Sequence, residues 1–294
     1  MAKTSFSELN LKNAFLFAAV MSDTESCRLI LEMILDKPIG KVSVNTEHSI
    51  LLNSDYRSVR LDVYAIEDKQ ISGGETAYET EEAGQLQVDY NVEMQNDRRT
   101  NLAKRSRYYQ AEIDVASLKP GEDIDNLRPN YVIFICTYDP FGYGLYRYVF
   151  ENRCVEQGFP LNDGTMKIFL NTKGKNPEAV PDVLVDFLKY IEVSTDSCAQ
   201  ESKDKRIELL HQNVMLLKKS RELESRYMRF GELLDVAAND AKAEGRAEGR
   251  AEGKEMLINL ICLMEEAGEG SLISKLGKDS AFLEEMLEKY HLNV

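Results

Sequence analysis

Residues 85–109 read QLQVDYNVEMQNDRRTNLAKRSRYY, and within them a strand pattern gives way to a helix pattern. Residues 85–94 have strand character, so their side chains should point alternately to the two faces of a sheet. After Gln95 the composition becomes basic, and apolar residues recur at helical spacing until Leu118, where the sequence Lys-Pro-Gly follows. We therefore predict a strand followed directly by an arginine-rich helix.

The flanking sequence extends this pair into a larger α/β core. Upstream, the patterns predict helical residues at 12–35 and strands at 42–46, 49–52 and 58–66. Downstream, the continuous apolar run at 131–137 is typical of a strand buried on both faces. Further strands are expected at 142–174 and a helix at 181–193. This order of helix, strands, helix and buried strand predicts the α/β fold class.

Composition excludes several classes of protein. The chain has 294 residues, 43% of them hydrophobic, and its 36 Lys and Arg against 50 Asp and Glu give a net charge of -14. No apolar run approaches the roughly 18 residues of a membrane span, so we predict a cytoplasmic protein without a membrane partner. Five scattered cysteines and three distant histidines offer little material for a metal knuckle, a disulfide framework or a Ser/Cys-His mechanism. The acidic balance argues against a general nucleic-acid coat but allows a local basic face.

The second half of the chain is expected to be mostly helical. We predict a first domain at residues 1–198, a helical extension at 199–242, a repeat segment at 243–254 and a C-terminal helical module at 255–294. The repeat segment reads AEGR, AEGR, AEGK. Each glycine costs a helix about 1 kcal/mol relative to alanine, which favours a linker. The period of four also keeps the glycines on one stripe, which favours a helix that holds a homo-oligomer together.

Polar residues gather where two of the predicted strands should meet. Glu93 and Gln95 should point to one face while Met94 points into the core. Asp62 can lie beside Glu93 if the two strands pair as an antiparallel hairpin. Two carboxylates and the carbonyl oxygen of Met94 would suit Mg²⁺, and the basic helix could hold a phosphate backbone. Phosphodiester chemistry is one interpretation. In the other, the acidic residues at the strand ends face solvent or pair with a lysine, and the basic helix presents a solvated face.

Several longer motifs follow one another along the chain. They are RLDV at 60–63, NVEMQ at 91–95, KRSRYY at 104–109, YVIFIC at 131–136, DPFG at 139–142, residues 148–154 and FLNTKG at 169–174. In this order, and with the AEGR repeats, they resemble the PD-(D/E)XK nuclease family transposases, the Rpn-type recombination-promoting nucleases. The resemblance covers most of the chain from Leu11 to about Lys254. It implies a restriction-endonuclease-like (PD-(D/E)XK) core, here residues 1–198, and metal-dependent DNA cleavage.

The resemblance also assigns roles to individual residues. Asp62 takes the place of the PD-motif aspartate and Glu93 that of the (D/E)XK acid, so both would be ligands of Mg²⁺ or Mn²⁺. Gln95 falls where the general superfamily has its lysine. A neutral amide cannot act as a general base, but it can orient a water molecule or donate to a phosphate oxygen.

Two departures from the family pattern lie nearby. Leu61 stands where a proline precedes the aspartate, and Asn13 and Ala14 occupy the region of the first helix where relatives often carry an acid. With the missing lysine and the acidic net charge, the altered helix motivates an alternative hypothesis. In it, the chain is a catalytically inactive DNA-binding or oligomeric assembly protein that keeps the nuclease fold.

The leading hypothesis is a Mg²⁺-dependent DNA endonuclease linked to DNA recombination or transposition. Its catalytic residues would be Asp62, Glu93 and Gln95, and the metal would also bind the carbonyl oxygen of Met94. The expected contacts to DNA phosphates are Arg98, Arg105, Arg107 and, more weakly, Tyr109, for which a core position is the competing role.

Overall fold

A computed structural model describes residues 4–50, 59–69, 86–98, 101–229, 231–232, 256–261, 263–276, 279–290 and 292, without the side chains of 46–50, 59–62, 69, 86 and 280. The chain divides into two compact units, Met1–Glu224 and Ser225–Val294. The acidic segment 70–85 and the repeats at 243–254 lie outside the described residues, so the linker and oligomer hypotheses for the repeats remain predictions.

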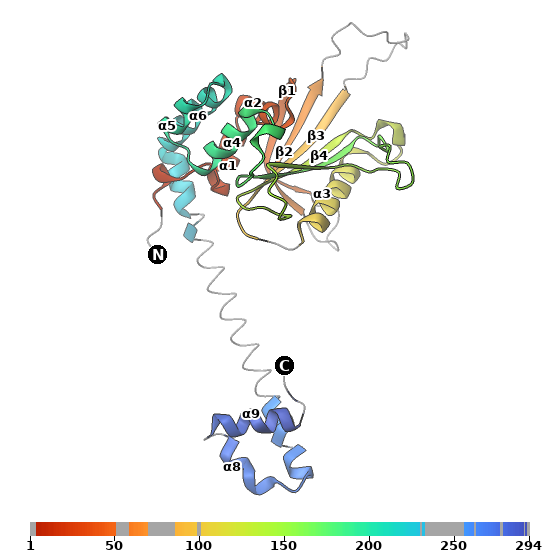
Figure 1. Cartoon of the computed structure of the whole chain (residues 1–294), viewed down its shortest axis with the longest axis vertical. Helices are drawn as coiled ribbons and strands as arrows, with labels where there is room; N and C mark the ends of the chain where they lie inside the picture. The colour runs from red at the N-terminus through yellow and green to blue at the C-terminus, as the bar shows by residue number, and fades with distance from the viewer. Residues whose placement is uncertain are drawn as a thin grey trace. The chain divides into compact units, whose positions relative to one another are not determined.

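The first unit is a mixed α/β structure built on a six-stranded open sheet (Figure 1). Its strands are β1 (Lys41–Ile50), β2 (Val59–Lys69), β3 (Leu86–Gln95), β4 (Asn130–Cys136), β5 (Arg147–Phe150) and β6 (Thr165–Asn171). They lie in the order β1-β2-β3-β4-β6-β5. The first three are antiparallel neighbours, β3, β4 and β6 are parallel, and β5 is antiparallel to β6. The α/β class predicted from the sequence is therefore confirmed.

Helices cover both faces of this sheet (Figure 1). They are α1 (Ala14–Met21), α2 (Thr24–Leu35), α3 (Leu102–Ser117), α4 (Asp182–Glu192), α5 (Asp196–Glu201) and α6 (Lys205–Lys218), with short 3₁₀ turns at Phe6–Glu8, Ile124–Asn126 and Pro177–Ala179. The α3 helix connects the parallel strands β3 and β4, and it is the one described helix that packs on this face of the sheet. The α1, α2 and α4 helices lie on the opposite face (Figure 1).

The predicted helical stretch at 12–35 is two helices because of local capping. Asn13 Oδ1 accepts a 3.2 Å hydrogen bond from Leu16 N–H at the start of α1, and Asp23 Oδ1 accepts one of 2.8 Å from Ser26 N–H at the start of α2. Each side chain satisfies an N–H group that has no partner within its helix. Asp36, with φ of 53°, then ends α2 in the left-handed conformation. In contrast, the strand predicted at 42–46 and residues 49–50 of the strand predicted at 49–52 belong to the single strand β1, and residues 51–52 lie outside the described residues.

A hydrophobic core lies between α3 and the sheet. Tyr64 of β2, Val132, Phe134 and Cys136 of β4, and Ile113 of α3 are among its buried residues. Alternate residues of β4 thus pack against the helix, and the rest of this strand is buried on the opposite face. This burial on both faces is the reason that β4 reads as a continuous apolar run.

The first unit includes part of the segment 199–242, which the sequence predicts as a helical extension. Ile207, Leu210 and Val214 of α6 are buried, and α6 contacts α1, α2 and α4. The compact unit therefore runs to Glu224, beyond the domain boundary predicted at residue 198. The buried residues of α6 therefore pack against the helices of the first unit.

The second unit contains a small helical cluster. Residues 256–261 and 263–266 are helical, and they are followed by a 3₁₀ turn at Gly270–Leu272 and by α8 (Ile273–Leu276) and α9 (Ser280–Lys289). Leu260, Met264, Leu276 and Met286 form its buried centre. In the described part of the chain, no helix combines the length and the apolar character needed to cross a membrane.

Candidate metal and phosphate site

The candidate site lies on β3, whose two faces differ completely in chemistry. Asp89, Asn91, Glu93 and Gln95 alternate with Val88, Tyr90, Val92 and Met94 along this strand, and all eight are buried. Glu93 and Gln95 both contact α3 through Arg105, so the polar column faces that helix. Burial of several polar side chains is costly unless they have partners, which makes this column the most unusual feature of the core.

Arg105 of α3 joins the two polar side chains at the end of the column. Its Nη1 donates a 2.8 Å hydrogen bond to Oε1 of Gln95, and its Nη2 lies 3.4 Å from Oε2 of Glu93. The Glu93 side chain is only 4% exposed and that of Arg105 is 22% exposed. The sequence placed Arg105 among the phosphate contacts, and the structure places it directly against the proposed metal ligand.

The remaining contacts hold Arg105 in one orientation. Nε and Nη2 donate to the hydroxyl of Tyr109, over 3.1 and 2.8 Å, and the guanidinium carbon lies 5.4 Å from the centre of the Phe134 ring. Nε2 of Gln95 donates to the carbonyl oxygen of Asp97 over 2.8 Å, which leaves its Oε1 facing Arg105. Tyr109 therefore positions the arginine and packs on Phe134, with ring centres 6.1 Å apart.

The sheet forks beside Glu93. Pairing of β2 with β3 ends at Val63 opposite Val92, although β2 continues to pair with β1 as far as Val59 and β3 with β4 as far as Gln95. The carbonyl of Gln95 accepts from Thr137 N–H, so it faces β4. Because backbone polar groups alternate along a strand, the carbonyl oxygen of Met94 faces the fork on the β2 side. This is the oxygen that the sequence predicted as a metal ligand.

Asp62 occupies the matching position on β2. It precedes Val63, whose partner Val92 precedes Glu93, so one more step of the same register would set residue 62 opposite residue 93. The side chain of Asp62 lies outside the described residues. Its proposed role as a ligand therefore stays a prediction that rests on its position in the strand.

Mg²⁺ requires few protein ligands because it keeps several water molecules and binds phosphate oxygens. The described residues offer the Glu93 carboxylate and the Met94 carbonyl at the fork, which are both hard oxygen ligands. They contain no cluster of three or more His, Cys, Asp or Glu side chains suited to a metal. The residues present thus fit a sparsely held Mg²⁺ or Mn²⁺ and do not fit a dedicated protein cage.

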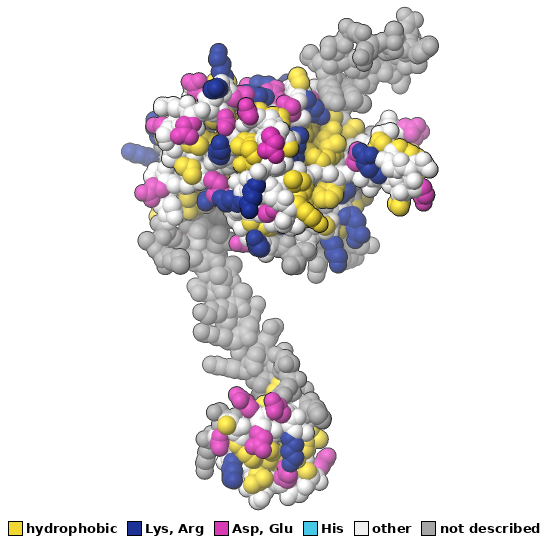
Figure 2. All heavy atoms as spheres, viewed as in Figure 1, with side chains coloured by type: hydrophobic (Ala, Val, Ile, Leu, Met, Phe, Trp, Pro, Cys, Tyr) yellow, Lys and Arg dark blue, Asp and Glu magenta, His cyan; other side chains and the backbone are white. Residues whose placement is uncertain are grey.

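The other predicted phosphate contacts lie on the surface. Arg98 and Arg107 are exposed, as is Lys104, and the Arg98 guanidinium lies 5.8 Å from the centre of the Tyr138 ring. Figure 2 shows Lys and Arg side chains gathered over the part of the surface where Figure 1 places α3. These cations can reach a phosphate without the rearrangement that the more buried Arg105 would need.

Comparisons of the chain with protein-family models, with curated proteins and with solved structures each found no match. No relative therefore assigns a role to any residue. The functional assignment of the site depends on its residues and their geometry.

The other end of the polar column is formed by Asp89, which the sequence analysis did not single out. Asp89 is fully buried; Tyr64 donates to its Oδ1 over 2.8 Å, and Arg128 Nε lies 3.1 Å from its Oδ2. Burial raises the pKa of Asp89, and the hydrogen bond from Tyr64 and the charge of Arg128 only partly oppose this. The period-two run of Asp89, Asn91 and Glu93 was the sequence signal for this column.

Asn91 sits between the two ends of the column and is also fully buried. Neither its amide nitrogen nor its amide oxygen has a hydrogen-bond partner among the described residues. Such an amide is rare in a protein core, because burying it without a partner costs free energy.

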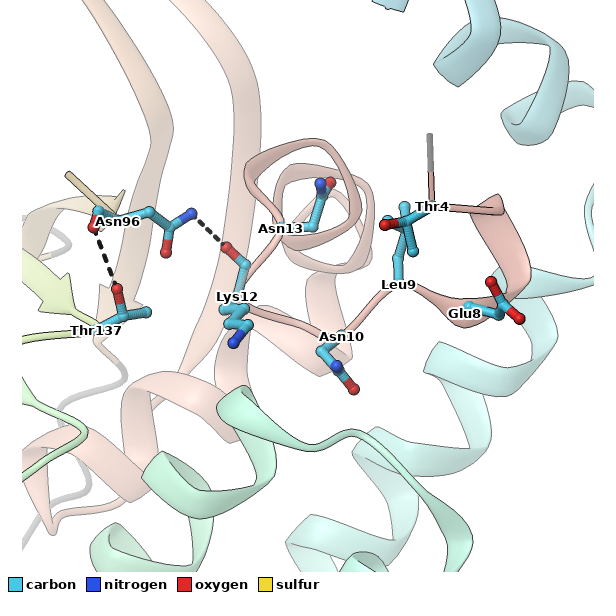
Figure 3. Close-up of a pocket in the computed structure, with 8 residues that line it drawn as sticks. All are labelled: Thr4, Glu8, Leu9, Asn10, Lys12, Asn13, Asn96 and Thr137. Carbon is cyan, nitrogen blue, oxygen red and sulfur yellow. Dashed lines mark hydrogen bonds between the residues drawn. The ribbon is translucent and has the colours of Figure 1, made fainter. Parts of the chain in front are cut away.

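A cavity of about 360 Å³ opens at the carboxyl ends of β3 and β4, beside the candidate site (Figure 3). Asn96 and Thr137, which follow the two strands, line one end, and Lys12 lies between them and Asn10 (Figure 3). Open α/β sheets bind ligands at such strand ends. Asn13 also lines the cavity, and its carboxamide oxygen caps α1, which gives it a structural role.

Glu192, which does not line this cavity, links Lys12 to the residues that follow β6. Glu192 accepts hydrogen bonds from Lys12 at 3.0 Å, from Lys173 at 2.7 Å and from Thr172 at 2.6 Å. Although burial acts to raise the pKa of Glu192, the hydrogen bonds from Lys173, Thr172 and Lys12 outweigh it and lower the pKa to about 2. Glu192 thereby neutralises much of the positive charge of the two lysines.

Proposed function

We propose that this chain is a metal-dependent DNA endonuclease with a restriction-endonuclease-like core. The single observation that carries the proposal is the fork between β2 and β3. It brings together the Glu93 carboxylate, the Met94 carbonyl and, by register, residue 62, and α3 sets Arg105 against them. Hydrolysis of a phosphodiester is promoted by oxygen ligands that hold a metal ion and by a positively charged side chain fixed beside them.

The element order supports the proposed core. A helix pair, three antiparallel strands, the crossover helix α3 and the parallel strand β4 follow one another, and the fork lies between the second and third strands. The motifs that resemble the PD-(D/E)XK nuclease family transposases fall on these elements, with RLDV on β2, NVEMQ on β3 and KRSRYY on α3. A role in recombination or transposition belongs to the same proposal and depends on the family resemblance.

A divalent cation held by Asp62, Glu93 and the Met94 carbonyl would stabilise the negative charge that develops on the phosphate. Arg105 supplies a second positive charge in the position that Gln95, a neutral amide, cannot fill. Its contact with Glu93 is the longest of its hydrogen bonds, so Gln95 and Tyr109 can hold the guanidinium while the carboxylate turns to another partner. Gln95 is therefore a positioning residue for Arg105.

The exposed cations of α3 would bind the DNA backbone outside the fork. Arg98 and Arg107, with Lys104, are surface residues near the start of this helix. Contacts of this kind set the register of DNA without reading its sequence, and they weaken as the salt concentration rises. Because the chain as a whole is acidic, this local face would carry most of the attraction for DNA.

Nicking of supercoiled plasmid with Mg²⁺ or Mn²⁺ tests the proposal. The wild-type chain should convert supercoiled to open-circular DNA, and EDTA should stop the conversion. Asp62→Asn and Glu93→Gln should each abolish it, whereas Asp125→Asn, which removes the same charge from an exposed position in the Ile124–Asn126 turn, should not.

The competing hypothesis is an inactive DNA-binding or assembly protein with the same fold. Nicking that is equal in the wild type, Asp62→Asn and Glu93→Gln would exclude the proposed site. DNA binding without nicking by the wild type under any divalent cation would favour this inactive protein.

A further inference from the structure

The strand β5 lies at the end of the sheet, and its outer edge is apolar. Among the residues that the structure describes, no strand follows β5 in the sheet. Val149 is 48% exposed and Phe150 is 44% exposed, although exposed edge strands usually carry lysine, proline or a covering loop. The connection from β5 to β6 projects as an arm (Figure 1), and Val155, Phe159 and Leu161 on it are more than half exposed.

The backbone of β5 has polar groups that face outward. Asn171 N–H donates to the carbonyl of Tyr146 over 2.9 Å, so residue 146 turns its backbone polar groups toward β6. Residues 148 and 150 share this direction because the groups alternate along a strand, and those of Arg147 and Val149 therefore point away from the sheet. An added strand would find both donors and acceptors there.

The sequence around β5 is complementary to itself when two copies run antiparallel. With the two-fold axis at Val149, Arg147 of one copy lies opposite Glu151 of the other, and Tyr148 lies opposite Phe150. An axis at Phe150 would set Arg147 against Arg153, and one at Tyr148 would set Glu151 against Leu145. Of these three registers, only the one centred on Val149 pairs opposite charges, and opposite charges across a ladder stabilise antiparallel pairing.

In the same register, the second copy also covers the exposed side of Phe150. Phe150 packs at 5.2 Å from Phe141 and 5.7 Å from Phe169, measured between ring centres, but one side of it remains open to solvent. Tyr148 of a second copy would lie against that side. The two charged residues can take part as well, since Arg147 uses one N–H group on the carbonyl of Ile34, and Glu151 pairs with the exposed Arg153.

We propose that this edge is a two-fold interface between two copies of the chain, with β5 paired to β5 in the register centred on Val149. The sheet then continues from one copy into the other. Because the pairing is antiparallel, the two copies of β3 run in opposite directions. Glu93 lies near the carboxyl end of β3, so the two Glu93 residues lie near opposite ends of the strands of the joint sheet. The interface is separate from the proposed nuclease site, and its test does not depend on DNA cleavage.

Size-exclusion chromatography with light scattering, over a range of concentrations of the full chain, tests this interface. The wild type should have the mass of a dimer. Val149→Lys buries an unpaired charge at the axis, and Val149→Pro removes an outward N–H group while the hydrogen bonds to β6 remain, so both should be monomers. Ile124→Lys makes the same exposed hydrophobic-to-lysine change outside the edge and should stay dimeric. Thermal denaturation of each variant shows whether it is folded.

Two further variants test the register. Glu151→Arg should weaken the dimer by at least tenfold in Kd, and Arg147→Glu combined with Glu151→Arg should restore it, because the charges again alternate. Val149→Cys should form a disulfide-linked dimer on mild oxidation, above the background of the native cysteines. A wild type that is monomeric throughout, or an oligomer whose mass is the same in Val149→Lys and Val149→Pro, would overturn the proposal.

Discussion

Arg105 donates a hydrogen bond of 2.8 Å to the side-chain oxygen of Gln95. The positive charge of the candidate site thus comes from α3, and the amide on β3 holds it in place. We expect Arg105→Lys to reduce nicking by about ten- to a hundredfold, because an ammonium group cannot bridge Gln95, Tyr109 and Glu93 at once. The rate with saturating Mn²⁺, measured beside Arg107→Lys, checks this. Equal losses in the two variants would show that Arg105 is only one of several surface cations.

Replacing Gln95 by the lysine that the general superfamily has at this position should lower both the stability and the nicking rate of this chain. Gln95→Lys would place an ammonium group where Arg105 now donates, and two cations at that distance repel each other by about 2 kcal/mol or more. We expect a lower melting temperature and slower nicking. Gln200→Lys makes the same substitution at an exposed residue of α5 and should change little. Faster nicking by Gln95→Lys would mean that Arg105 does not serve as the cation of the site.

Asn91 offers a test of the buried polar column. Its amide atoms have no described partner, so Asn91→Leu should leave the free energy of unfolding unchanged or raise it by about 1 kcal/mol. Asn130→Leu should instead destabilise the fold, because Asn130 Nδ2 donates to Asp114 over 2.5 Å. Chemical denaturation of the two variants compares them directly. Equal destabilisation would indicate that Asn91 binds an internal water molecule.

Glu192 should make the stability of the fold depend on pH. Its pKa falls from 4.5 to about 2 on folding, so its contribution is complete above pH 4.5 and is lost as the pH falls toward 2. Glu192→Gln should therefore lower the melting temperature at neutral pH, and the difference from wild type should shrink through this window. Asp186→Asn is a control, because its contact with Lys189 is 3.9 Å long and partly exposed. A difference that persists undiminished at pH 2 would contradict the assignment.

Local periodicity was enough to predict the main elements of the first unit. The period of two placed Glu93 and Gln95 on one face, where both now contact Arg105. The contact itself could not be predicted, because it depends on how α3 crosses β3. The packing of Leu210 in α6 against distant helices leaves no local signal either. Likewise, Asn13 could be recognised as a cap only once the start of α1 was known.

Binding of a divalent metal at the fork is the claim on which the account depends. Titration of the DNA-free chain with Mn²⁺ by calorimetry measures it without requiring cleavage. We predict a saturable site in the wild type and in Asp125→Asn, and its loss in Glu93→Gln and Asp62→Asn. Mn²⁺ binding that is the same in Glu93→Gln as in the wild type, or no binding by the wild type at all, would contradict a metal site formed by Glu93.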